Sequence, residues 1–168
     1  MPNKQYLETY EHVVGASVFA PVAPDAFYEV VRDVRSFPDW APGVRRVEVL
    51  ENLGEPGMLS EWEVSFLGLR KKVQSVLEED ERPEFLRWSY EGPVEGWGEC
   101  AIRQQGAGTL AEFRTGVAPA DRHLESLMGS SIARGAASSQ LRRALQRLGD
   151  LVARDDGRVI VGPPVGLL

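Results

Sequence analysis

The stretch DVRSFPDWAPGVRRVEVLE, residues 33–51, changes its pattern halfway along. Upstream of it apolar residues recur at helical spacing, and its second half alternates valine with charged residues, as a strand does. Between the two patterns stand two large aromatics, two prolines and a glycine: Phe37, Pro38, Trp40, Pro42 and Gly43. Because the residue before a proline avoids helical backbone angles, we expect a helix that ends near Phe37. A strand over 44–51 should follow.

Working outward from this stretch, the remaining sequence divides into strands and one long helix. Residues 12–19 have the alternation of a strand, and Pro24 suits the first turn of the helix that follows. Short turns join the later segments, which implies antiparallel neighbours. The later strands are expected over 44–51, 58–66, 69–80, 84–90, 95–104 and 109–117. Helical spacing returns from about 119 to 153, with many small residues in its middle, and glycines and prolines end it.

Composition limits the classes of protein that the chain can represent. Its 168 residues, 43% of them hydrophobic, suit a single domain, which we place at 1–154 with a C-terminal tail at 155–168. The net charge of −6 disfavours nucleic acid as a partner. With one cysteine, no signal peptide and no apolar run long enough to span a bilayer, a cytoplasmic location is expected, without stable membrane insertion. Whether the chain forms a homodimer is left open.

Alternation sorts the strand residues onto two faces of one sheet. Charged residues fall on the face expected to be solvated: Glu61, Glu63, Arg70, Lys72, Arg87, Glu99, Glu112 and Arg114. Apolar residues, among them Met58, Leu77 and Leu86, fall on the other face, which predicts a sheet with one buried side. Trp97 is in phase with the charged residues, so we expect a bulge or a sheet edge there.

The order of these elements resembles that of the helix-grip fold. Together with VFAPVAPDAFYEVVRDVRSFPDWAPGVRRVEVLE, residues 18–51, it resembles the START-like superfamily (SRPBCC), in particular the polyketide cyclase/dehydrase and coenzyme-Q-binding branch. The resemblance extends over about residues 12–153. It implies an α+β fold in which a curved antiparallel sheet of about seven strands wraps around a long C-terminal helix, with short helices after the first strand. It also implies an apolar cavity between the sheet and that helix.

Two interpretations remain for the aromatics of the opening stretch. As implied by the resemblance, Phe37 and Trp40 would be wall or lid residues of the cavity, held in place by Pro38 and Pro42. Alternatively, they pack as plugs that seal one edge of an ordinary core.

A ligand pocket should have a volume of about 300 Å³ or more. Its walls would be rich in aromatics with a few neutral polar groups, a lining that suits a hydrophobic ligand with one or two oxygens. An ordinary filled core is the competing interpretation. The expected ligand-binding residues are Phe37, Trp40, Trp62, Val64, Phe66, Val73, Ser75, Trp88, Tyr90, Cys100, Phe113, Leu127 and Ile132.

Signals of other chemistry are weak. His12 and His123 are not at metal-ligand spacing with another ligand, and Cys100 is more readily explained as a small packing residue. We find no nucleotide-binding or hydrolase motif, and we expect neither a metal nor a cofactor.

Two functions therefore stay open. The first is a binding module for a lipid, an isoprenoid, a quinone or a polyketide-like molecule. The second is a polyketide aromatase/cyclase, which would need an acid or base on the inner face, and the alternation places none there clearly. A protein-interaction role is a third class, against which the acidic balance counts.

Overall fold

The computed structural model describes residues 12–52, 57–66, 68–119 and 131–168. Each predicted strand is present within two residues of its expected bounds. The elements, in chain order, are β1 (His12–Ala20), α2 (Pro24–Arg32), η1 (Val34–Ser36), α3 (Phe37–Trp40), β2 (Val44–Glu51), β3 (Leu59–Phe66), β4 (Leu69–Glu81), β5 (Phe85–Glu91), β6 (Val94–Gln105), β7 (Gly108–Pro119), α5 (Ser131–Ala153) and β8 (Ile160–Gly162).

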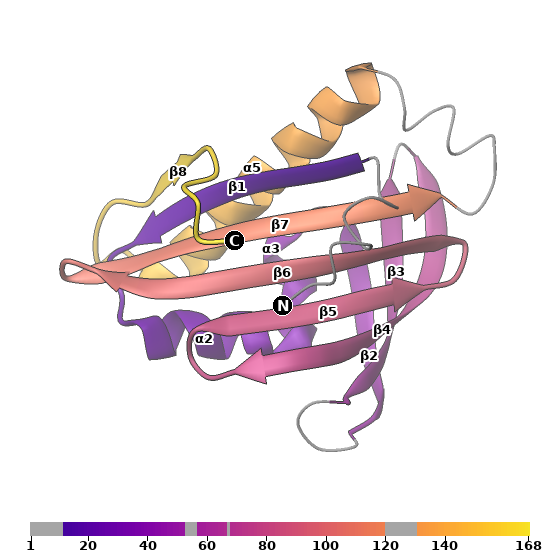
Figure 1. Ribbon diagram of the computed structural model, residues 1–168, viewed down its shortest axis with the longest axis horizontal. Helices are drawn as coiled ribbons and strands as arrows, with labels where there is room; N and C mark the ends of the chain where they lie inside the picture. Colours follow the sequence, from indigo (N-terminus) through magenta and orange to yellow (C-terminus); the bar gives the residue numbers. More distant parts are fainter. Residues whose placement is uncertain (1–11, 53–56, 67, 120–130) are drawn as a thin grey trace.

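All strands belong to one antiparallel sheet with the order β2-β3-β4-β5-β6-β7-β1-β8. The sheet curves, and the helices α2, α3 and α5 lie on its inner side (Figure 1). The α+β helix-grip fold is thus confirmed. Leu145 and Leu148 of α5 are fully buried against this sheet and belong to the same apolar core as Phe27 of α2 and Phe113 of β7.

The segment between β1 and β2 contains the predicted short helices, but the expected helix end near Phe37 is wrong. Helix α2 already ends at Arg32, because the backbone of Asp33 is extended (φ −76°, ψ 94°). The Asp33 carboxylate accepts a hydrogen bond from the Arg35 N–H and so begins η1. Pro38 lies in the first turn of α3, where no N–H is needed. Phe37 therefore begins a helix instead of ending one.

The C-terminal segment adds an eighth strand that the sequence pattern does not predict. β8 pairs with β1, and Ser17 Oγ donates to the carbonyl of Pro163 at 2.7 Å. Beyond it, the Glu112 carboxylate accepts N–H groups from Val165, from Gly166 at 2.9 Å and from Leu168 at 2.8 Å. Glu112 is only 3% exposed, so these bonds satisfy a buried carboxylate.

Trp97 lies on the outer face without a bulge or an edge, which corrects the sequence interpretation. β6 is an interior strand, and Trp97 pairs in regular register with Ser89 of β5 and Gly116 of β7. A Cβ atom at Gly116 would lie 2.6 Å from Trp97 Nε1, so only glycine leaves room for the indole. The guanidinium groups of Arg87 and Arg114 lie 5.4 and 5.6 Å from the ring centroid, within cation–π range.

Part of the outer face is buried, although alternation predicts a solvated face. Arg87 and Glu99 are 4% and 1% exposed, and Arg87 Nη1 donates to Glu99 Oε1. Arg114 Nη2 donates to the other oxygen of the same carboxylate at 3.2 Å. The expectation of a solvated face is therefore wrong for Arg87, Glu99 and Glu112. Alternation shows which face a residue occupies, but it does not show what covers that face.

Candidate functional site

An aromatic cluster fills the inner side of the sheet, with Phe37 at its centre. Its ring centroid lies 4.4 Å from that of Trp40, 4.6 Å from that of Trp62 and 5.8 Å from that of Trp88. Trp40 in turn lies 6.1 Å from Phe113. Such tilted and edge-to-face pairs are the favoured arrangements of aromatic rings. Helix α3 and strands β3, β5 and β7 thus supply one continuous aromatic interior.

Glycine on a neighbouring strand lets Trp88 lie flat against the sheet. A Cβ atom at Gly98, which pairs with Trp88, would lie 2.4 Å from the indole ring. The Trp88 Nε1–H donates to the hydroxyl of Tyr90, two residues along β5. Burial raises the pKa of Tyr90, so its phenol stays protonated at neutral pH. It is therefore a hydrogen-bonding group and not a base.

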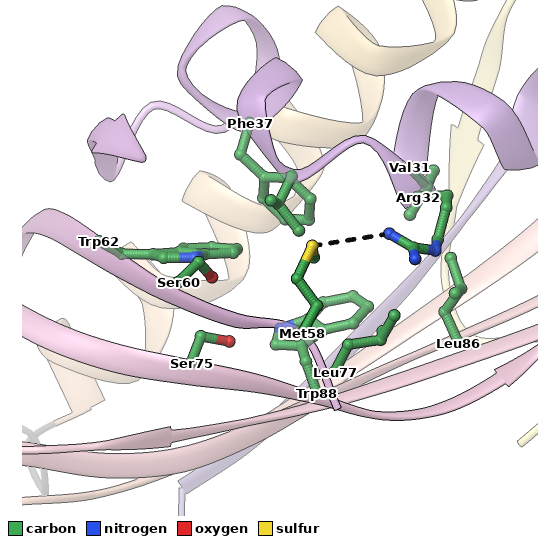
Figure 2. Close-up of a pocket in the computed structure, with 11 residues that line it drawn as sticks. Val31, Arg32, Phe37, Met58, Ser60, Trp62, Ser75, Leu77, Leu86 and Trp88 are labelled. Atoms are coloured by element: carbon green, nitrogen blue, oxygen red, sulfur yellow. Dashed lines mark hydrogen bonds between the residues drawn. The ribbon is translucent and has the colours of Figure 1, made fainter. Parts of the chain in front are cut away.

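A small cavity of about 10 Å³ lies between this cluster and helices α2 and α3 (Figure 2). This volume is about that of a single water-sized probe and is far below the roughly 300 Å³ expected of a ligand pocket. The cavity is lined by Val31, Arg32, Val34, Phe37, Met58, Ser60, Trp62, Ser75, Leu77, Leu86 and Trp88.

This cavity lies elsewhere than the one expected between the sheet and the C-terminal helix, and that expected cavity stays a prediction. The walls of the small cavity come from α2, η1, α3 and strands β3–β5, and none of the lining residues belongs to α5. Phe37 and Trp40, 4% and 3% exposed, occupy the interior as packed core residues. This burial favours the interpretation of both residues as plugs.

The expected ligand-binding residues divide into three groups. Phe37, Trp62, Ser75 and Trp88 line the cavity. The surrounding core contains Trp40, Val64, Val73, Tyr90, Cys100 and Phe113, which do not line it. Leu127 lies outside the described residues, as do the side chains of Phe66 and Ile132.

Two polar lining residues, Arg32 and Ser60, were not among the expected site residues. Ser60 alternates with Trp62 of β3 and with Met58, which directly precedes that strand, so alternation could have found it. Arg32 carries no such signal, because a charged residue in the last turn of a surface helix usually points to solvent. Its inward position depends on a partner from a distant strand.

That partner is Asp80 of β4. Arg32 Nε donates to Asp80 Oδ2 at 2.8 Å, and the Tyr28 hydroxyl donates to Oδ1. The Asp80 side chain is 2% exposed. Burial and the hydrogen bond to Asp80 raise the pKa of Tyr28 above its usual range. The Tyr28–Asp80–Arg32 group therefore holds a guanidinium at the edge of the cavity.

Two serine hydroxyls give the cavity its neutral polarity. Ser60 Oγ accepts from Trp62 Nε1 at 2.7 Å. Ser75 is 2% exposed and pairs with Ser60 across β3 and β4. Cys100, fully buried nearby in the core, has a thiol whose pKa burial raises, which makes it a poor nucleophile.

A curved antiparallel sheet with a C-terminal helix on its inner side is also the fold of START-like proteins. Solved structures with this fold include a START superfamily protein from Mycobacterium smegmatis (TM-score 0.71, 15% identity, 85% of this chain and 98% of that chain). A second is a protein from Thermus thermophilus (TM-score 0.74, 18% identity, 86% and 99%). A third is the Zhui aromatase/cyclase from a Streptomyces species (TM-score 0.68, 19% identity, 86% and 95%).

The chain belongs to the family described as polyketide cyclase/dehydrase and lipid transport, which matches residues 11–153. The coenzyme-Q-binding part of the resemblance stays a prediction. No curated protein sequence matches the chain significantly. Within the described residues, no helix is both long and apolar enough to cross a membrane.

Proposed function

We propose that the protein binds a hydrophobic small molecule with at least one oxygen acceptor in the aromatic interior on the inner side of the sheet. The observation that carries this proposal is the pair of serine hydroxyls, Ser60 and Ser75, that line a space otherwise walled largely by aromatic and aliphatic side chains. Sites for small molecules are mostly apolar and contain a few polar groups that fix the orientation of the ligand. A ligand oxygen would accept a hydrogen bond from the Ser75 hydroxyl.

A ligand larger than a water must displace side chains, because the cavity holds only about 10 Å³. Phe37 is the central obstacle, and it lies on α3, a helix of four residues between η1 and a turn. So short a helix contributes little rigidity of its own. We infer that Phe37 moves with α3 when a ligand enters.

Native mass spectrometry of the purified protein, followed by organic extraction, tests the proposal. We expect a noncovalent adduct, and saturable binding of the neutral fluorophore N-phenyl-1-naphthylamine after the adduct is removed. Ser75→Ala should weaken binding of a ketone-bearing analogue by about fivefold, the worth of one hydrogen bond, without lowering the free energy of unfolding. Ser60→Ala is the contrasting variant, because it leaves Trp62 Nε1 unpaired and should lower stability. If the protein carries no adduct and also shows no saturable probe binding, the proposal is contradicted.

A polyketide aromatase/cyclase is the second candidate, and Arg32 is the observation that favours it. A guanidinium that lines an apolar cavity could stabilise the enolate oxygen formed during aldol closure. The described lining residues include no carboxylate or histidine that would act as the base.

Tyr90→Phe separates the two functions. If the protein is a binder, ligand affinity should fall by no more than about tenfold, and unmodified protein should show no turnover of poly-β-ketone mimics. Product analysis by liquid chromatography with mass spectrometry provides the measurement. Cyclisation that drops about 100-fold or more in the variant would identify an enzyme that uses Tyr90 as a general acid.

A further inference from the structure

A groove of about 290 Å³ opens on the surface directly beside the internal cavity. Arg32, Val34 and Met58 line both spaces, so these side chains lie between the groove and the cavity. The described residues that line the groove are Glu29, Arg32, Asp33, Val34, Arg35, Val49, Asn52, Met58 and Arg82.

Met58 is the movable part of this partition. Its side chain is 6% exposed, and its Sδ lies 3.9 Å from Arg32 Nη1 (Figure 2). The backbone beside it is fixed, because the carbonyl of Met58 accepts the N–H of Leu77 and the N–H of Gly57 donates to the carbonyl of Leu77. An unbranched thioether side chain changes rotamer readily. Movement can therefore occur in the side chain without opening the sheet.

Arg32 is the fixed part of the partition. Its ion pair with Asp80, at 2.8 Å, is nearly excluded from solvent, and Tyr28 holds the other oxygen of the same carboxylate. The opening must therefore form on the Met58 side.

The charges of the groove define the end of the ligand that would remain there. Three arginines and two acidic residues are among its described lining residues, and Arg32 is already paired with Asp80. Glu29 pairs with Arg82, and Asp33 accepts the backbone N–H of Arg35. The exposed guanidinium of Arg35 is thus the group best placed to meet an anion arriving from solvent.

We propose that this groove is the entrance to the interior site and that it recognises the anionic end of an amphiphilic ligand whose apolar body lies inside. The proposal rests on the proposed function and adds a route and a ligand class. Val34, Val49 and Met58 provide the apolar path, and Arg35 provides the charge.

Stopped-flow fluorescence tests the route with two probes of related aromatic structure, neutral N-phenyl-1-naphthylamine and anionic 1-anilinonaphthalene-8-sulfonate. Met58→Ala should raise the association rate constant of both probes about tenfold by lowering the entry barrier. Met58→Leu, which keeps the bulk, should not. Because Met58→Ala could destabilise the core, Val49→Trp is an independent variant that should slow entry by narrowing the groove. Glu48→Trp, on the exposed face of the same strand, is its control.

Arg35→Gln tests the ligand class. It should weaken binding of the sulfonate probe about fivefold and leave the neutral probe unchanged. Arg103→Gln, at an exposed position on β6, should change neither. If Met58→Ala and Val49→Trp leave the association rate constant of the neutral probe unaltered, the groove is not the entrance. If Arg35→Gln weakens the binding of both probes equally, Arg35 does not recognise the anionic end of the ligand. In either case, binding of the neutral probe would still support the proposed function, whereas its absence in the unmodified protein would count against that function itself.

Discussion

Replacing Trp40 by alanine should lower the free energy of unfolding by about 3 to 5 kcal/mol, the usual cost of removing a buried tryptophan. The side chain is 3% exposed, and its ring contacts those of Phe37 and Phe113. Its Nε1–H also donates to Ser36 Oγ at 3.1 Å. Denaturant unfolding with an unchanged m-value provides the measurement.

This substitution also decides between a plug and a lid. If Trp40 is a plug, the alanine variant should lose much stability without losing probe affinity, because truncation of the side chain enlarges the interior. If Trp40 is a lid, the alanine variant should take up the probe more weakly and show little change in stability. Trp40→Phe is the matched control, since it keeps an aromatic ring beside Phe37 and should lose less than the alanine variant. An alanine variant that unfolds at the same denaturant concentration as the parent would contradict the packing described above.

Replacing Glu99, on the opposite face of the sheet, by glutamine should lower the free energy of unfolding by a comparable amount. It removes the negative charge to which both Arg87 and Arg114 donate, and it leaves the Arg87 guanidinium buried beside a neutral amide. Removing one partner of a buried ion pair typically lowers the free energy of unfolding by about 3 to 5 kcal/mol. Arg87 keeps a second contact with Glu78 at 3.2 Å, which places the expected loss near the lower value.

The control for Glu99→Gln is Glu61→Gln on the same face. Glu61 lies 3.7 Å from Lys72, but both side chains are substantially exposed. An exposed ion pair contributes about 1 kcal/mol or less, so this variant should unfold almost as the parent does. Combining Glu99→Leu with Arg87→Met should recover part of the loss, because well-packed apolar residues replace a buried ion pair at little cost. Equal effects of Glu99→Gln and Glu61→Gln would show that the buried network adds no stability.

The fold could be predicted because its signals are local. Alternation in Val47 and Val49, turn residues between strands, and the opening stretch around Phe37 each act over a few residues. These signals placed the strands and put Trp62 and Trp88 on the inner side of the sheet. They also carried the resemblance to the family that matches residues 11–153.

The candidate site was predicted only in part, because its polar members depend on distant partners. Arg32 faces the cavity edge since Asp80, 48 residues away, holds its guanidinium. The size of the cavity likewise depends on how Phe37 packs between Trp62 and Trp88, and no local pattern reports the volume that remains.

What the amino-acid sequence determined is therefore the order of the elements, the side of the sheet that each strand residue faces, and the family. Only the tertiary structure decided what covers each face. Glu99 and Glu112 look like solvated residues by alternation, yet one lies between two arginines and the other binds backbone N–H groups as far along the chain as Leu168. The physical reason is that alternation follows from the geometry of a single strand, whereas burial, ion pairing and cavity volume follow from contacts between segments that only the folded chain brings together.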